Sequence, residues 1–282
     1  MTGNVRICPF CGKLNAREDD RCIRCSRRLP SAGEALVTNT VRRWLGDEYP
    51  LTKVFIGISV LVYVGMMLSG GSPSLMGGVQ PLSALRWGAL FGDLGPTEPW
   101  RYLSAMFVHF GLLHLGLNCL TLHALGRSTE SGVGSLRFAI VFLGTGIVGF
   151  VASDLFYSRP PLTGGISGGV FGLLGVAAGW RYADRDPEWK RLALTGFGYA
   201  AVMWLLPGFS VNNAAHLGGL IAGGLLGWAF YRERRSGRYR TLVNAFGVLL
   251  LCATPPSIAL SYIVTPVVPQ RSSIQPPGII QR

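Results

Sequence analysis

Charged residues are scarce in this chain, and acidic residues are the scarcest of them. Only 14% of the 282 residues are charged, with 26 Lys and Arg against 14 Asp and Glu, whereas soluble domains carry roughly 25%. Hydrophobic residues make up 49% of the chain, and there are 39 glycines, which suit helices that pack closely in lipid. The composition therefore argues against an ordinary soluble domain and predicts a membrane protein.

Histidine is also rare, and the sequence lacks motifs of several membrane protein classes. None of the four histidines is followed by Glu, so the HExxH motif of zinc proteases is absent. Asp154 stands at a predicted helix end and the other Asp residues lie in loops, which disfavours an aspartyl protease with two aspartates inside helices. We find neither an internal repeat nor a charged pathway, so a transporter or a channel is disfavoured as well.

Basic loops divide the rest of the chain into apolar segments. Each segment is near the ~20 residues that a membrane-spanning helix needs. The seven predicted helices cover residues 51–69, 102–125, 134–153, 165–181, 191–206, 213–231 and 241–264. Pro255 and Pro256 interrupt the last segment and are expected to kink or shorten its helix. The net charge is +12, and the basic residues that cause it lie mainly in the loops between the segments. We therefore expect these residues to set the membrane orientation, and we expect no nucleic-acid partner.

The same pattern predicts the domain boundaries and the orientation. We expect a separate unit at residues 1–30, a linker at 31–50, a transmembrane domain at 51–264 and a disordered tail at 265–282. The Arg-rich loops follow the second, fourth and sixth segments, so the positive-inside rule puts them and the N-terminus in the cytoplasm. The C-terminus lies outside if the seventh helix spans. We expect a multi-pass protein of a prokaryotic plasma membrane.

Four of the six cysteines form two CxxC pairs near the N-terminus. Four thiolates at this spacing complete the tetrahedral shell of a structural zinc ion and leave no position open for catalysis. The predicted ligands are Cys8, Cys11, Cys22 and Cys25. No secretory signal precedes them, and a reducing cytoplasm disfavours disulfides or a redox pair. We expect a zinc ribbon that caps the cytoplasmic side or binds a cytoplasmic protein partner.

Ser167 stands in the run GGISGG at residues 164–169, where the fourth apolar segment begins. The flanking Gly165 and Gly168 leave its hydroxyl accessible. Backbone N–H groups at a helix N-terminus favour negative charge, as an oxyanion hole requires. A serine that only caps the helix explains the same run, so this motif does not establish catalysis by itself.

His216, in the sixth segment, is the base that a serine nucleophile needs. The predicted topology starts the fourth and sixth segments on the outer side, which puts Ser167 and His216 at a similar depth. No Asp or Glu lies near either residue in the sequence, so the two are expected to act as a dyad. Gly219 and Gly223 form a GxxxG pair that allows close approach to a neighbouring helix, either that of Ser167 or another helix of the bundle.

The other histidines fall in the second segment. His114 and Asn118 are four residues apart and share a helix face, and ionisable groups at membrane depth are functional candidates. His123 lies near the cytoplasmic end of the same segment and is expected to cap the helix or to reach the interface.

Taken together, these motifs resemble the rhomboid family of intramembrane serine proteases. The resemblance covers about residues 51–264 and rests on GISG (165–168), AHLGGLIAG (215–223), HLGLN (114–118) and a Trp-Arg pair (100–101) ahead of them. It implies an all-α polytopic fold with a rhomboid-like six-helix bundle and one added C-terminal helix. The roles that it implies are nucleophile for Ser167 and general base for His216.

The resemblance implies roles for further residues. His114 and Asn118 match the pair that stabilises the oxyanion together with the backbone N–H of Ser167. His109 matches a histidine of structural role, and Trp100 and Arg101 match a structural motif of the first loop.

Two positions depart from the family pattern. Ile166 stands where a smaller residue is common, and Phe171 stands where some relatives carry Tyr. Phe171 is still expected to stack on the ring of His216, although it brings no hydroxyl to a hydrogen-bond network. Neither departure touches the expected nucleophile or base.

The activity that the resemblance implies is cleavage of single-pass transmembrane proteins in the lipid bilayer, near the outer membrane boundary and without a catalytic cofactor. The alternative is a non-catalytic rhomboid-like protein that holds or escorts membrane clients and uses the zinc ribbon as an adaptor. Replacing Ser167 separates the two, because only the protease depends on its hydroxyl.

Overall fold

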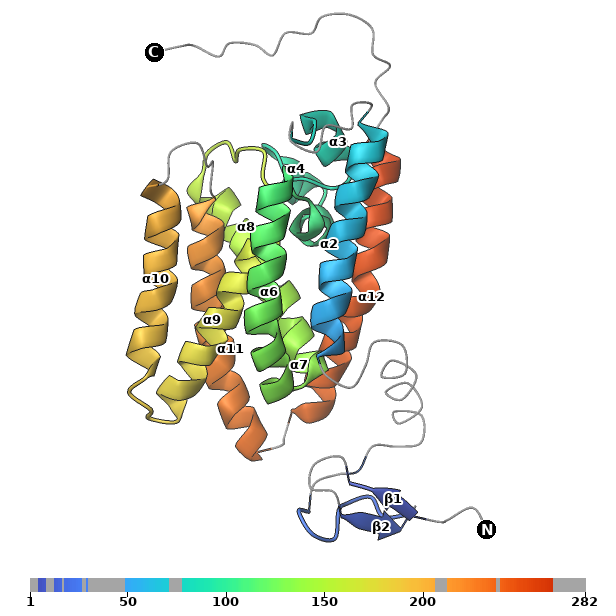
Figure 1. Cartoon of the computed structure of the whole chain (residues 1–282), viewed down its shortest axis with the longest axis vertical. Coiled ribbons are helices and arrows are strands. Elements are labelled where there is room, and N and C mark those ends of the chain that lie inside the picture. Colours follow the sequence, from blue (N-terminus) through green and yellow to red (C-terminus); the bar gives the residue numbers. More distant parts are fainter. Residues whose placement is uncertain are drawn as a thin grey trace, which may run out of the picture.

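The computed structural model describes residues 5–8, 13–16, 18–26, 29, 49–70, 78–205, 212–236 and 239–265. Cys11, almost all of the predicted linker at 31–50 and all but the first residue of the predicted tail at 265–282 lie outside the described residues. The described part consists of a small hairpin and a bundle of helices (Figure 1).

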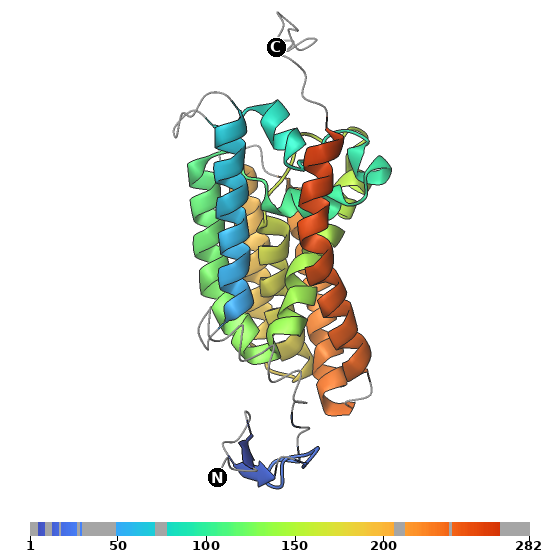
Figure 2. The ribbon, with the colours of Figure 1, turned by 90° about the vertical axis from the view of Figure 1, so that its right-hand side faces the viewer.

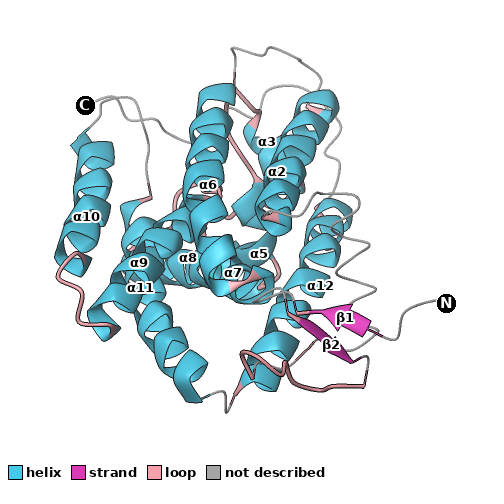
Figure 3. Ribbon diagram, turned by 60° about the horizontal axis from the view of Figure 1, so that its bottom comes forward, coloured by secondary structure: helices cyan, strands magenta, loops and turns pink. Residues whose placement is uncertain are grey.

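The hairpin pairs strand β1 (Val5–Ile7) with strand β2 (Leu14–Ala16) in antiparallel register (Figure 3). Asn15 in β2 is buried, and its side-chain oxygen accepts the backbone N–H of Ile23 at 2.9 Å. This bond ties the hairpin to the following turn, which carries Cys22 and Cys25.

The helices of the bundle run roughly along one direction (Figures 1 and 2). The long helices are α2 (Pro50–Ser69), α6 (Leu112–Val133), α8 (Thr145–Phe156), α9 (Ser167–Ala183), α10 (Trp189–Leu205), α11 (Asn213–Ser236) and α12 (Arg240–Val264). The shorter elements are α3 (Pro81–Arg86), α4 (Leu94–Thr97), α5 (Arg101–Ser104), the 3-10 turn η1 (Ala105–Phe107), α7 (Ser135–Ala139) and the π-helical η2 (Ile140–Gly144). The last two continue directly into α8.

Several of these helices are long and apolar enough to cross a membrane. Within the described residues they are Pro50–Ser69, Ser135–Phe156, Asn213–Glu233 and Thr241–Val264. The bent pair Arg101–Phe107 and Leu112–Val133 adds another if it forms one span. Helices α9 and α10 are shorter, at 17 residues each. The chain is a multi-pass helical membrane protein, and the count of six helices plus one stays a prediction.

The second predicted helix differs most from the structure. One helix over 102–125 is wrong, because α5 and η1 are bent by 98° from α6, which runs from Leu112 to Val133. Val108 and Gly111 have extended backbones between the two parts. Arg101, in α5 ahead of the bend, is 2% exposed, and its guanidinium donates to the backbone carbonyls of Leu85 and Ala89 at 2.7 and 3.2 Å. These bonds hold α5 against the preceding loop.

The prolines do not shorten the last helix, which was one of the two effects expected from them; the other, a kink, stays a prediction. Helix α12 includes both Pro255 and Pro256. The hydroxyl side chains beside the prolines bond to carbonyls of the same helix, but not to those of Leu251 and Cys252, which lose their N–H donors to the prolines. Here Thr254 donates to the Leu250 carbonyl at 2.9 Å and Ser257 to the Thr254 carbonyl at 2.7 Å.

Helix α9 lies inside the bundle, where it packs against α6, α8, α10 and α11 (Figure 1). Every residue from Gly168 to Gly179 is buried except Ala177. A helix that starts with a catalytic candidate and is covered on several sides forms a rigid support for that residue.

A buried carboxylate joins α6 to the start of α2. Glu130 is 3% exposed and accepts the backbone N–H groups of Leu51 and Thr52 at 3.0 and 2.8 Å. It also accepts the hydroxyls of Thr52 and Ser135, at 2.8 and 2.7 Å. A negative charge at a helix N-terminus is favourable, because the N–H groups of the first turn have no partner within the helix.

Candidate functional site

Ser167 and His216 form a direct hydrogen bond. The Oγ atom of Ser167 and the Nε2 atom of His216 are 2.8 Å apart, although 49 positions separate the residues in the chain. Ser167 begins α9 and is half-buried, whereas His216 lies in the first turn of α11 and is 6% exposed. A hydroxyl within hydrogen-bond reach of an imidazole is the arrangement that activates a serine nucleophile.

The turn before α9 places Ser167 at the first residue of the helix. Ile166 is the residue that precedes the first helical position, and it makes no side-chain capping bond. Ser167 is already helical, so the interpretation as a helix cap does not apply to it. Gly165 has a backbone φ of +125°, which residues other than Gly rarely adopt. Its N–H donates to the Ala105 carbonyl at 2.9 Å and fixes the turn.

His114 and Asn118 approach this turn from α6. A Cβ atom on Gly165 would lie 3.0 Å from His114 Nε2 and 3.9 Å from Asn118 Nδ2. Asn118 is 8% exposed, and its amide donates to the His114 carbonyl at 3.0 Å. The His114 ring stacks on Phe110, with ring centroids 6.2 Å apart. Two side-chain nitrogens therefore flank the turn of Ser167, as donors to an oxyanion must.

The ring of His216 is held by an aromatic side chain. Phe171 stacks on it with ring centroids 4.4 Å apart and an angle of 12° between the planes. The Nδ1 atom of His216 is buried and has no hydrogen-bond partner within the described residues. Stacking on Phe171 therefore orients the ring whose Nε2 atom contacts Ser167, and the assignment of the pair as a catalytic dyad stays a prediction.

Glycines bring the two helices of the dyad together. A Cβ atom on Gly219 of α11 would collide with the Gly168 carbonyl of α9, and one on Gly223 would collide with the Gly172 carbonyl. The GxxxG pair thus lies against the helix of Ser167. The close backbone contact that it permits sets the separation of the helices that carry Ser167 and His216.

Arg101 and His109, which the sequence also singled out, lie in the segment before α6. Arg101 forms an ion pair with Glu98 at 2.6 Å and donates to the Thr265 hydroxyl at 2.7 Å. Buried His109 has its Nδ1 atom 3.1 Å from the Phe107 carbonyl. These contacts stabilise α5 and η1, the segment whose Ala105 carbonyl receives the Gly165 N–H.

Trp100 and His123 make no direct contribution to the dyad. The indole nitrogen of Trp100 is buried and has no hydrogen-bond partner in the part of the chain described. His123 contacts the ring of Tyr49 edge-on, with centroids 5.8 Å apart. Neither position therefore has a described contact to Ser167.

Sequence reasoning missed Asn212, the residue directly before α11. Its side-chain oxygen accepts the Ala215 N–H at 3.0 Å, and its amide donates to the Ser153 hydroxyl at 2.7 Å. An Asn directly before an apolar helix is an N-cap signal, and it was available in the sequence. The partner on α8 was not, because 59 positions separate the two residues.

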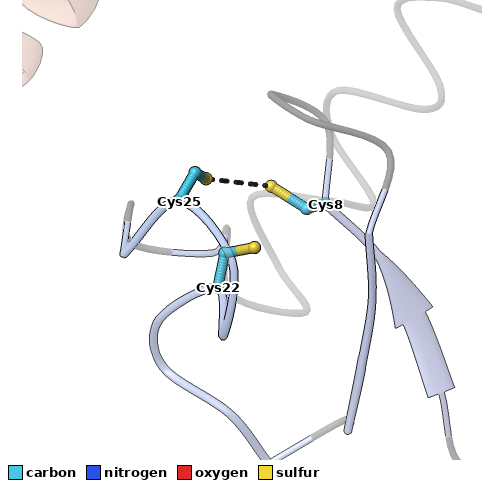
Figure 4. A group of neighbouring side chains, drawn as sticks. All are labelled: Cys8, Cys22 and Cys25. Atoms are coloured by element: carbon cyan, nitrogen blue, oxygen red, sulfur yellow. Dashed lines mark hydrogen bonds between the residues drawn. The ribbon is translucent and has the colours of Figure 1, made fainter.

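The described cysteines of the N-terminal unit converge (Figure 4). The Sγ atoms of Cys8, Cys22 and Cys25 all lie within 4.8 Å of one another, and those of Cys8 and Cys25 are 3.7 Å apart. Tetrahedral zinc with bonds of about 2.3 Å separates its sulfur ligands by about 3.8 Å. The Arg24 N–H points at Cys22 Sγ at 3.4 Å. These three residues fit a metal ion, and Cys11, the fourth predicted ligand, lies outside the described residues.

Comparisons with known proteins support the rhomboid family. Residues 96–233 match the family described as the rhomboid domain. The chain is 33% identical over 160 residues to Rhomboid-type serine protease 2 of Emericella nidulans and 30% identical over 212 residues to Rhomboid protease GluP of Bacillus subtilis. It is also 30% identical over 180 residues to Rhomboid protease GlpG of Salmonella choleraesuis.

The relatives are longer than the part that they share with this chain. The three matches cover 54%, 72% and 62% of this chain, but 31%, 37% and 60% of the respective relatives. The chain thus spans between about a third and three fifths of their lengths. The matched family region nevertheless contains the whole constellation around Ser167, from residue 100 to residue 223.

Proposed function

We propose that this chain, with its rhomboid domain at residues 96–233, is an intramembrane serine endopeptidase with a dyad of Ser167 and His216. The observation that carries the proposal is the 2.8 Å contact between Ser167 Oγ and His216 Nε2. A serine hydroxyl is a weak nucleophile until a base within reach takes its proton. The relatives named as serine or rhomboid proteases support the same class.

The reaction begins when the scissile carbonyl of a substrate enters beside Ser167. His216 Nε2 accepts the hydroxyl proton while Oγ attacks the carbonyl carbon, and the oxygen becomes an oxyanion. His114, Asn118 and the backbone N–H of Ser167 stabilise that charge. His216 then returns the proton to the leaving amine, which completes the acyl-enzyme. Water, deprotonated by the same imidazole, hydrolyses the ester and regenerates Ser167.

The substrates are single-pass transmembrane proteins, cleaved near the outer membrane boundary. Ser167 and His216 both stand at the starts of their helices, and the Arg-rich loops at the opposite helix ends favour a cytoplasmic location for those ends. We therefore assign the N-terminus to the cytoplasm, six helices to the core and α12 to an added helix. A C-terminus outside follows from that count.

The N-terminal unit is a zinc ribbon with Cys8, Cys11, Cys22 and Cys25 as ligands. The 3.7 Å separation of the Cys8 and Cys25 sulfurs supports a tetrahedral ion. Four thiolates leave no open position, so zinc supplies a structural cross-link there and has no part in peptide cleavage. The ribbon is then available to bind a cytoplasmic protein.

The decisive experiment is active-site labelling of purified protein with a fluorophosphonate probe, together with cleavage of a single-pass protein in proteoliposomes. We expect labelling of the wild type and none of Ser167→Ala or His216→Ala. Ser131→Ala is the matched control, because Ser131 is exposed on α6, and it should label like the wild type. Equal labelling of His216→Ala would rule out the dyad. Full cellular function of Ser167→Ala would favour the client-binding alternative.

A further inference from the structure

The side chain of Asn212 connects three parts of the molecule that surround the dyad. Its oxygen accepts the Ala215 N–H at 3.0 Å and so caps α11, while its backbone carbonyl accepts the His216 N–H at 3.2 Å. Its amide nitrogen donates to the Ser153 hydroxyl of α8 at 2.7 Å and to the Thr163 hydroxyl at 3.2 Å. One amide group therefore both starts the helix of His216 and links it to two neighbours.

The first neighbour, Thr163, belongs to the segment that delivers Ser167 to the site. It pairs with Leu90 through two backbone hydrogen bonds, of 2.8 and 3.0 Å. Gly165, which has φ of +125°, follows two residues later in the turn before Ser167. The link from Asn212 to Thr163 thus connects the base-bearing helix to the nucleophile-bearing turn by a route separate from the dyad itself.

The second neighbour, Ser153, fixes α11 against α8. Ser153 is 0% exposed and Thr163 is 7% exposed, so either hydroxyl would be costly to leave without a partner. The backbones also meet closely here, since a Cβ atom on Gly149 of α8 would collide with the Ala215 carbonyl. Asn212 fastens the end of α11 at the point where the helix is pressed on α8.

We propose that Asn212 is a positioning residue that sets the distance between Ser167 and His216. The inference rests on the proposed function. Asn212 lies one helical turn before His216, so a shift of the first turn of α11 moves the imidazole directly. Its short side chain places an acceptor toward α11 and a donor toward the two hydroxyls at once. A misplacement of about 1 Å costs on the order of 100-fold in rate when reacting groups must be aligned.

The test separates capping of α11 from linkage to the two hydroxyls. In Asn212→Ser the shorter side chain still caps the helix but does not reach Ser153 and Thr163. In Asn212→Asp the carboxylate caps the helix and accepts from both hydroxyls, which rotate to donate. Asn244→Ala, on α12, is the control for an asparagine outside the linkage. Each variant is treated with the fluorophosphonate probe over a range of concentrations, well below its melting temperature.

We expect Asn212→Ser to lower the maximal labelling rate constant by about 10- to 100-fold, with little change in the half-saturating probe concentration. Asn212→Asp should restore the rate to within about threefold, and Asn244→Ala should match the wild type. If Asn212→Ser does not fold, the double variant Ser153→Ala, Thr163→Val removes the linkage while Asn212 keeps its cap, and it should show the same loss of rate.

Two results would contradict the inference in distinguishable ways. Labelling of Asn212→Ser, or of the double variant, at the wild-type rate would mean that Asn212 only stabilises the fold, while the proposed peptidase would stand. Failure of the wild type itself to label would overturn the proposed function, and the positioning role of Asn212 with it.

Discussion

At the scale of single residues, Glu130 shows how a buried charge is accommodated far from the chemistry. Its carboxylate has four hydrogen-bond donors, two of them backbone N–H groups at the start of α2. Asn118, near the turn of Ser167, and Glu130 belong to the same helix but stand twelve residues apart, or about 18 Å along its axis. The carboxylate therefore fastens α6 to α2 without reaching the dyad.

Replacing Glu130 should weaken the fold and spare the active site. Glu130→Gln keeps the shape of the side chain but loses the charge and part of its accepting capacity. Because hydrogen bonds to charged groups contribute about 1.5–3 kcal/mol, we expect the free energy of unfolding to fall by about 2–3 kcal/mol. Unfolding in mixed detergent micelles measures this change. Probe labelling of Ser167 at low temperature should stay at the wild-type rate.

Glu188→Gln is the matched control for Glu130→Gln. Glu188 pairs with Arg191, whose side chain is 77% exposed, and such surface pairs contribute about 1 kcal/mol or less. An equal loss of stability in both variants would show that the bonds of Glu130 to α2 have no special weight.

The residues predicted from the sequence differ from those it missed in how clearly the sequence marks them. Ser167 and His216 stood out because few polar groups occur in the apolar segments, and the structure brings them within hydrogen-bond distance. Glu130 and Asn212 carry equally specific contacts, but their partners lie 79 and 59 positions away. Ser167 and His216 are also far apart, by 49 positions, but motifs and loop charges mark both of them, whereas nothing in the sequence marks the partners of Glu130 and Asn212.

At the scale of elements, the packing of α9 on α11 depends on glycine carbonyls that face glycine Cα atoms.

The helix positions that the hydrophobic pattern predicted agree with the structure to within a few residues for most segments. The pattern could not reveal the bend between η1 and α6, because residues 102–125 are apolar on both sides of it. The hydrogen bonds of Arg101, which hold α5 against the segment before it, are also invisible to hydropathy.

Two neighbouring glycines of α11 should respond differently to the same substitution. A Cβ atom on Gly223 would collide with the Gly172 carbonyl, whereas one on Gly224 would find its nearest atom 3.8 Å away. We expect Gly223→Ala to cost about 1–3 kcal/mol through overpacking and to slow labelling of Ser167, because α9 must move. Gly224→Ala should be neutral or slightly stabilising, since Ala favours the helix. Comparable behaviour of the two variants would contradict the close backbone contact.

At the scale of the whole molecule, the chain joins two units that are stabilised by different physics. The bundle buries apolar side chains around α9. The hairpin unit has a small core. Among the described residues, its buried hydrophobic side chains are Cys8, Cys22 and Leu29. Exposed apolar side chains at Val5, Ile7 and Ile23 show that burial alone does not stabilise this unit, and a metal cross-link would compensate.

The two units should therefore respond independently to metal removal. We expect purified protein to contain one zinc ion per chain by elemental analysis, and Cys22→Ser to lose most of it, while Cys119→Ser, altered within α6, retains it. Without metal the ribbon should unfold, which limited proteolysis would detect as cleavage within residues 1–30. Labelling of Ser167 and cleavage in proteoliposomes should persist after chelation, because the proposed reaction of Ser167 and His216 needs no metal ion. Full zinc content in Cys22→Ser would exclude the thiolate site, and loss of labelling on chelation would mean that the ribbon supports the dyad.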